Sequence, residues 1–323
     1  ARGELSTKEK IRAQAQRLLQ SPRAREVMGA FGLSYLGAEE ILTNDKSAVV
    51  YPDFKASARL SMAEETRRLF SHVVFDGTGR FPELFSADYS FLNAELARRY
   101  GVTGVSGDAL NKTPYGSVAA QRAGVLGHGS VLGTYAHSDQ SSPIRRGLFV
   151  RRQLLCQELP PPPPNAGRLP AVDPKATTRE RFRQHSDVPF CKSCHQYIDG
   201  LGFGFERFDA VGSFRDAENG RPIDGIGDLD DVEVLGSATH EQYASLKELG
   251  ALLGSSPRAK QCFVRKATRY ARGAQEDVAE DLCTLWRLEN RFAESGYDIK
   301  ELFLAIAESE EFLYRAAGKG ARP

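Results

Sequence analysis

The chain has few sulfur atoms, one tryptophan and no long apolar run. Its 323 residues include two methionines and five cysteines. No stretch approaches the roughly 18 to 20 continuous apolar residues that cross a bilayer, so we expect no membrane span. Lys and Arg (43) nearly balance Asp and Glu (42), which excludes a global field that would attract nucleic acid. The sequence also has no phosphate-binding glycine loop and no nucleophile elbow. Cysteine and histidine are therefore the candidate functional residues.

Helical periodicity dominates the sequence and predicts a mainly α fold. Apolar residues make up 41% and charged residues 26%, as in ordinary globular proteins. Ser21-Pro22 has the signature of a helix start, Thr177 and Glu180 have capping-box spacing, and Gly101 is placed to end a helix. The expected helices follow Ser6, Ser21 and Pro52, and then run over 87–100, 143–155, 177–185, 245–253, 257–272, 277–294 and 298–314.

Three domains are expected from this pattern. Residues 1–105 would form an N-terminal helical domain. Residues 106–218 would form a loop-rich middle domain that contains a cysteine motif and five prolines, and 219–323 a C-terminal helical bundle. The prolines at 160–164 favour a stiff polyproline II strap of about 15 Å, at roughly 3.1 Å per residue.

The cysteine motif is Cys191-Lys192-Ser193-Cys194-His195, the attachment pattern of haem c. Residues three apart share one face of a helical turn, so both sulfurs can bond the same porphyrin edge. The next residue, His195, can then ligate the iron as a proximal histidine. The motif therefore predicts one covalently bound haem c. A thioredoxin-type redox pair or a structural zinc site remains the alternative, although the flanking strand-helix alternation and additional nearby ligands are lacking.

Residues near the motif are suited to a haem pocket. Phenylalanines could wall the apolar ring and two glycines would allow close approach of the backbone, although such phenylalanines also serve as ordinary core. The residues concerned are Phe190, Phe203, Phe205, Phe208, Gly202 and Gly204. Arginines could pair with haem propionates, and the candidates are Arg179, Arg181, Arg183 and Arg215.

The second axial ligand decides what such a haem would do. Met62 is favoured because methionine is scarce and Met/His ligation is common in electron-transfer cytochromes, although its place in a helical apolar stripe also suits a core residue. His128, between Gly127 and Gly129, is the alternative. An open distal site would instead permit peroxide or oxygen chemistry.

Cys262 and Cys283 are equidistant from a turn near Arg272 and Gly273, so a helical hairpin would place them at equal height. This spacing predicts a disulfide and an oxidising compartment, with two buried free thiols as the alternative. Cys156 is then expected to be a buried thiol.

Two charged clusters have ordinary explanations. The acidic residues between Asp224 and Glu233 could bind calcium but lack EF-hand spacing, so a solvated loop is the simpler interpretation. The arginines at 145, 146, 151 and 152 could form a docking patch for an acidic partner, with a solvated helix face as the default.

Three stretches of the chain carry a family resemblance. They are LFSADYSFLNAELARRYG from Leu84, preceded by SMAEET from Ser61; GVLGHGSVLGTYAHSDQSSPIRRG from Gly124 together with LLCQELPPPPPN and TTRERFRQHSDVPFCKSCHQYIDGLGFGFERFDAVGSFRD; and the C-terminal region ending AESEEF at Phe312. These stretches resemble planctomycete and myxobacterial cytochrome-like proteins built from domains of unknown function 1592, 1588 and 1585. Gly200 departs from the family pattern, which usually has proline there. The resemblance implies a secreted or envelope-associated bacterial protein with covalent haem, lacking a longer N-terminal part.

The function expected from these observations is single-electron transfer by a monohaem c-type cytochrome that meets a redox partner protein. Its expected location is periplasmic, outer-membrane-associated or extracellular. A haem-dependent oxidase or peroxidase with an open distal site is the alternative. A third possibility is a module without haem that uses the cysteines for a disulfide or zinc.

Overall fold

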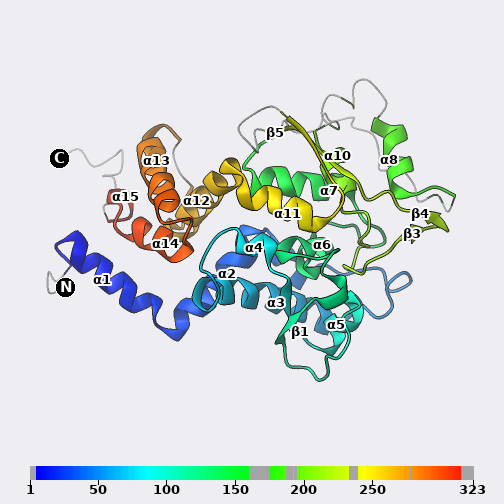
Figure 1. Ribbon diagram of the computed structural model, residues 1–323, viewed down its shortest axis with the longest axis horizontal. Coiled ribbons are helices and arrows are strands. Elements are labelled where there is room, and N and C mark those ends of the chain that lie inside the picture. Colours follow the sequence, from blue (N-terminus) through cyan, green and yellow to red (C-terminus); the bar gives the residue numbers. More distant parts are fainter. Residues whose placement is uncertain are drawn as a thin grey trace.

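The computed structural model describes residues 5–159, 173, 175–186, 192, 195, 197–232, 239–275 and 278–313. Phe190, Cys191, Cys194, Glu233 and the prolines at 160–164 lie outside these residues. The described part is mainly helical with three two-stranded sheets, which confirms the expected fold class. In Figure 1 the molecule is elongated, with α1 and α12 to α15 at one end and α8, β3 and β4 at the other.

The elements follow in this order along the chain. The N-terminal part contains α1 (Lys8–Leu19), α2 (Pro22–Tyr35), η1 (Glu39–Leu42), α3 (Ala56–Phe75), α4 (Glu83–Ser86), β1 (Tyr89–Leu92) and α5 (Ala94–Tyr100). The middle contains β2 (Asn111–Pro114), η2 (Gly116–Val118), η3 (Gly124–Gly127), α6 (Gly129–Thr134), α7 (Pro143–Leu148), η4 (Phe149–Leu154), α8 (Thr178–Ser186) and α10 (Asp199–Phe203). The last part contains β3 (Ala217–Glu218), β4 (Arg221–Pro222), β5 (Gly227–Val232), β6 (Thr239–Tyr243), α11 (Leu246–Ser255), α12 (Pro257–Arg272), α13 (Val278–Glu294), α14 (Ile299–Ala307) and α15 (Glu310–Leu313).

Several helices begin and end with capping interactions. The Ser256 side chain accepts a hydrogen bond from the Ala259 amide at the start of α12, and Gly273 ends that helix with φ of 64°. Before α8, the Thr177 amide donates to the Glu180 carboxylate (2.7 Å) and the Glu180 amide donates to the Thr177 hydroxyl (3.3 Å). These reciprocal bonds confirm the capping box.

The helix expected over 87–100 is wrong in its first half. Tyr89 to Leu92 instead form β1, which pairs antiparallel with β2 so that Tyr89 faces Pro114 and Leu92 faces Asn111. Burial alternates along this strand, since Ser90 and Leu92 are fully buried while their neighbours are half-buried. The helix starts only after Asn93, whose side chain accepts from the Leu96 amide. Two further expected helices are also modified: η4 is a π-helical continuation of α7, and 298–314 is divided into α14 and α15.

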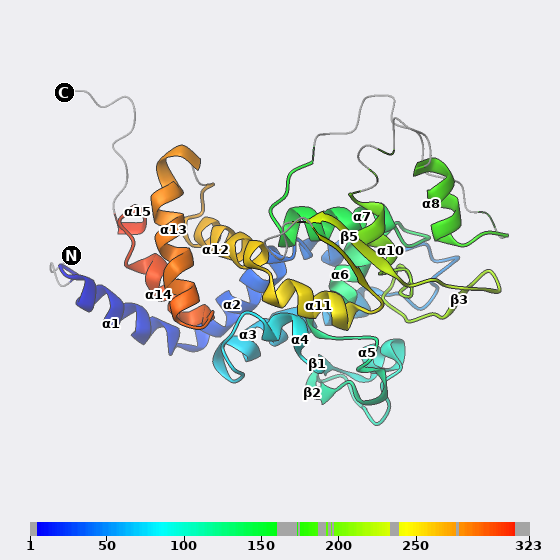
Figure 2. The ribbon, with the colours of Figure 1, turned by 45° about the horizontal axis from the view of Figure 1, so that its top comes forward.

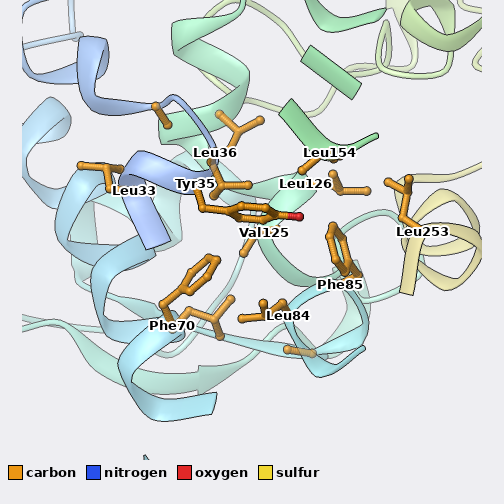
Figure 3. Packing of buried hydrophobic residues seen from close by; sticks show 14 of the residues in the cluster. Leu33, Tyr35, Leu36, Phe70, Leu84, Phe85, Val125, Leu126, Leu154 and Leu253 are labelled. Atoms are coloured by element: carbon orange, nitrogen blue, oxygen red, sulfur yellow. The ribbon is translucent and has the colours of Figure 1, made fainter. Parts of the chain in front are cut away.

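One hydrophobic core extends through the N-terminal, middle and C-terminal parts. Figure 3 shows its centre, where Tyr35 of α2 lies among residues of α3, α4, η3, η4 and α11, including Phe70, Phe85, Leu126, Leu154 and Leu253. The N-terminal and C-terminal parts also contact each other, because the Phe81 amide donates to the Tyr297 carbonyl (3.0 Å) and the Ile299 amide to the Gly79 carbonyl (2.8 Å). Figure 2 shows the adjacent α1 and α14, which Arg12 joins through ion pairs with Glu301 and Glu308.

The disulfide joins Cys156 to Cys262, so the pairing expected between Cys262 and Cys283 is wrong. Equal height on a helical hairpin does not place two residues on the same face. Cys262 is on the buried face of α12, where its sulfur lies 3.5 Å from the Gln153 carbonyl oxygen, whereas Cys283 is an exposed free thiol. Cys156, expected to be a buried thiol, is half-buried and bonded.

Within the described ranges, no helix is both long and apolar enough to cross a membrane.

Candidate functional site

His195 and Lys192 are the two residues of the cysteine motif that the structure describes. His195 is half-buried just before α10, and its carbonyl accepts from the Ile198 amide (3.0 Å). Its Nδ1 atom lies 2.9 and 3.1 Å from the two carboxylate oxygens of Asp199, which is 4% exposed. The hydrogen bond to Asp199 raises the pKa of His195, partly offset by burial. The imidazole is thereby held with Nδ1 directed to the carboxylate, and Nε2 is its opposite ring nitrogen.

The α10 segment that carries Asp199 is packed closely against neighbouring backbone. Gly147 of α7 touches the Ile198 carbonyl, and Gly202 touches the backbone of Pro143, so a Cβ atom at either glycine would overlap its neighbour. The Tyr243 hydroxyl donates to the Leu201 carbonyl (2.5 Å), and Gly204 packs on the ring of this tyrosine. In the structure, Gly202 and Gly204 therefore accommodate α7 and β6.

The predicted phenylalanine wall falls partly within the protein core. Phe205 is fully buried, and Phe203, at 7% exposed, lies beneath the Arg179 guanidinium at 4.5 Å. Phe208 packs edge-on against Phe214 with ring centroids 5.5 Å apart. Phe190 is outside the described residues, so the contact of this group with a haem stays a prediction.

Arg215 is already bonded to protein acceptors. Its guanidinium donates to the Ser141 hydroxyl (3.0 Å) and the Glu206 carboxylate (3.2 Å), and lies 3.3 Å from Glu218. Glu206 is buried, and its pKa is raised by burial and held back by the Arg146 and Arg215 charges. A propionate at Arg215 would have to compete with these carboxylates, so propionate binding by Arg215 stays a prediction.

Arg146 is buried, which corrects the expected solvated helix face. It donates to the carbonyls of Phe205 (2.9 Å), Phe208 (2.7 Å) and Asp209 (2.7 Å). Arg151 is also buried and donates to the Tyr197 carbonyl, beside His195. These two arginines fix the backbone on either side of α10.

The two proposed distal ligands lie together at the contact of α3 and α6, since Met62 belongs to α3 and His128 immediately precedes α6. Met62 is fully buried and packs against Gly129. His128 is also fully buried, and its Nδ1 atom lies 2.9 Å from the Thr66 hydroxyl while Nε2 lies 3.2 Å from the Ser90 hydroxyl. Burial and the Arg122 charge lower the pKa of His128 to about 3, so the ring is neutral. Ligation by either residue stays a prediction.

The sequence interpretation missed a buried carboxylate in this region. Glu65 is fully buried and accepts hydrogen bonds from the Ser90 hydroxyl (2.7 Å) and the Tyr100 hydroxyl (2.6 Å). Burial raises its pKa to about 7, although these hydrogen bonds oppose the shift. The sequence does indicate that Glu65 is buried, because this residue lies between Met62 and Leu69 on the apolar stripe of the helix.

Comparisons with protein families match three consecutive regions of the chain. Residues 1–102 match protein of unknown function (DUF1592), 122–218 match protein of unknown function (DUF1588), and 239–312 match protein of unknown function (DUF1585). The middle match contains the cysteine motif, His195 and Asp199. Searches of curated proteins and of solved structures find no match. Along the chain the three matches follow in the order DUF1592, DUF1588 and DUF1585.

Proposed function

We propose that the protein is a monohaem c-type cytochrome that transfers single electrons in the bacterial cell envelope. The observation that supports this most is the hydrogen bond between His195 Nδ1 and the buried carboxylate of Asp199. A metal-bound histidine commonly donates its second ring nitrogen to a carboxylate, which fixes the ring and its tautomer. Here Nε2 would be the nitrogen that binds iron.

The residues fit a covalent haem by the chemistry of the available donors. Cys191 and Cys194 would form the two thioether bonds and His195 the proximal ligand, with Met62 as the favoured distal ligand and His128 as the alternative. Bound haem supplies a one-electron redox centre. The protein would hold this centre and the His195 ring in place, so that electron transfer needs little rearrangement.

The disulfide between Cys156 and Cys262 supports an oxidising compartment, because such bonds are rare in the cytosol. The periplasm, the outer membrane surface and the extracellular space all meet this condition. The partner in this proposal is a second redox protein.

A pyridine haemochrome spectrum tests the proposal directly. Protein produced with c-type maturation machinery should give the c-type band, and the double variant Cys191→Ser, Cys194→Ser should lose it. Cys283→Ser, which removes an exposed thiol outside the motif, is the matched control and should keep the band. A colourless wild-type protein would overturn the proposal.

The alternative is an oxidase or peroxidase with an open distal site. Both ring nitrogens of His128 face hydroxyl groups, and Met62 is buried at the α3–α6 contact. If these contacts persist in the haem-loaded protein, neither residue binds the iron and the distal site is open. High-spin iron that binds cyanide rapidly would support the enzyme, whereas a low-spin spectrum with a sulfur-to-iron band would support electron transfer.

A further inference from the structure

The carboxylate of Asp199 lies close to the His195 ring and is shielded from water. Both of its oxygens lie within 3.1 Å of His195 Nδ1, and its side chain is only 6% exposed while that of His195 is 16% exposed. Water therefore screens this pair weakly, and a charge here acts more strongly than it would at the surface. Any charge that develops on the far side of the imidazole would be felt by this carboxylate.

The backbone holds Asp199 in place from both sides. Ile198, immediately before it, is packed against Gly147, and Gly202, one turn later, is packed against Pro143. The Leu201 carbonyl accepts from the Tyr243 hydroxyl, and the Tyr197 carbonyl accepts from Arg151. With its flanking residues fixed on α7, η4 and β6, Asp199 cannot readily turn away from His195.

We infer that Asp199 is a positioning residue that lowers the reduction potential of an iron bound to His195, an inference that rests on the proposed function. A carboxylate that accepts from Nδ1 raises the basicity of the imidazole as a ligand. Its negative charge also stabilises the oxidised iron, which carries one more positive charge than the reduced iron. The reduced protein is therefore a stronger electron donor than it would be if an uncharged group accepted the Nδ1 hydrogen bond. The partner expected from this is a protein that accepts an electron from the haem.

A purely structural role would predict something different. An i, i+4 contact can by itself stabilise a helix. Such a role would change the stability of the fold and leave the potential unchanged. The substitution Asp199→Asn separates the two, since asparagine has nearly the same shape and can still accept from Nδ1 but carries no charge.

The experiment is spectroelectrochemical titration of the haem-loaded protein. We expect the midpoint potential of Asp199→Asn to shift upward from wild type, and that of Asp199→Glu to stay closer to wild type because the charge is kept. Asp216→Asn is the matched control, since it removes the same charge from an exposed side chain (78%) paired with Arg207, and its potential should equal that of wild type.

An unchanged or lowered potential in fully haem-loaded Asp199→Asn would overturn the inference and leave the proposed function standing. Absence of haem from the wild-type protein would instead defeat the proposed function. Should Asp199→Asn fail to mature, the same titration of Asp199→Ser, which also removes the charge, takes its place. An upward shift of its midpoint potential supports the inference, and an unchanged or lowered potential contradicts it.

Discussion

Cys156 and Cys262 form a disulfide that joins the end of η4 to the middle of α12, across a sequence separation of 106 residues. It connects the region matched by DUF1588 with the region matched by DUF1585. The bond also lies two residues after the helical segment that contains Arg151, the residue that binds the Tyr197 carbonyl close to His195.

Removal of this disulfide should destabilise the protein considerably. Closing a loop of this length contributes about 4 to 5 kcal/mol in the loop-entropy model. We expect the double variant Cys156→Ser, Cys262→Ser to lose free energy of unfolding on this scale in urea titrations. Cys283→Ser should unfold as wild type does. Trypsin mapping that found Cys262 bonded to Cys283 would contradict the structure.

Arg146 should be a major contributor to the stability of the segment after α10. Arg146→Met leaves four backbone carbonyls and the Glu206 carboxylate without their buried cation, and loss of one partner from such a group costs about 3 to 5 kcal/mol. Arg145→Met, at the exposed neighbouring position, should cost about 1 kcal/mol or less. Equal losses in the two variants, measured by urea unfolding, would show that burial of Arg146 has been misassigned.

The stability of the protein should depend on the protonation of Glu65. Its folded-state pKa of about 7 lies above its usual value of 4.5, so its contribution is fully present below pH 4.5 and is lost as pH rises through about 7. The loss between these limits is roughly 3 kcal/mol. Glu65→Gln, which resembles the protonated acid, should therefore remove this part of the decline between pH 5 and pH 8.

Unfolding in urea at the two pH values measures this effect. The control is Glu64→Gln, since Glu64 is only half-buried and pairs with Arg68 on the helix surface. It should decline with pH as wild type does. A Glu65→Gln variant that declined as steeply as wild type would show that Glu65 is ionised throughout this range.

Optical and electron paramagnetic spectra should identify the distal ligand. We expect Met62→Ala to convert the iron from low to high spin, while His128→Ala leaves it low spin, because Met62 is the favoured ligand. The opposite result would assign His128. High-spin iron already present in wild type would support the open site of the alternative function.

The sequence predicts the helices well where local chemistry decides their limits. The helix expected over 257–272 matches the observed Pro257–Arg272, which Ser256 caps at its start and Gly273 ends. β1 was missed because its residues are compatible with a helix, and the pairing with β2 involves residues about twenty positions further along the chain. The partner of Cys262 was missed for a similar reason, since its choice depends on which face of α12 meets η4.

The sequence predicts which residues of the candidate site could bind haem, but not the tertiary contacts that surround them. The motif predicts His195 as a ligand by spacing alone, but nothing in that spacing selects Asp199 as the acceptor for Nδ1. Burial of Arg146 was also hidden, because its acceptors are backbone carbonyls of a segment about sixty residues later in the chain. Contacts of this kind arise from tertiary packing and have no local signature.

The most direct test of the account is the intact mass of native protein purified from a host that matures c-type cytochromes. The account predicts the polypeptide plus one haem, with the added mass on the peptide that contains Cys191 and Cys194. A mass equal to that of the bare polypeptide would contradict it.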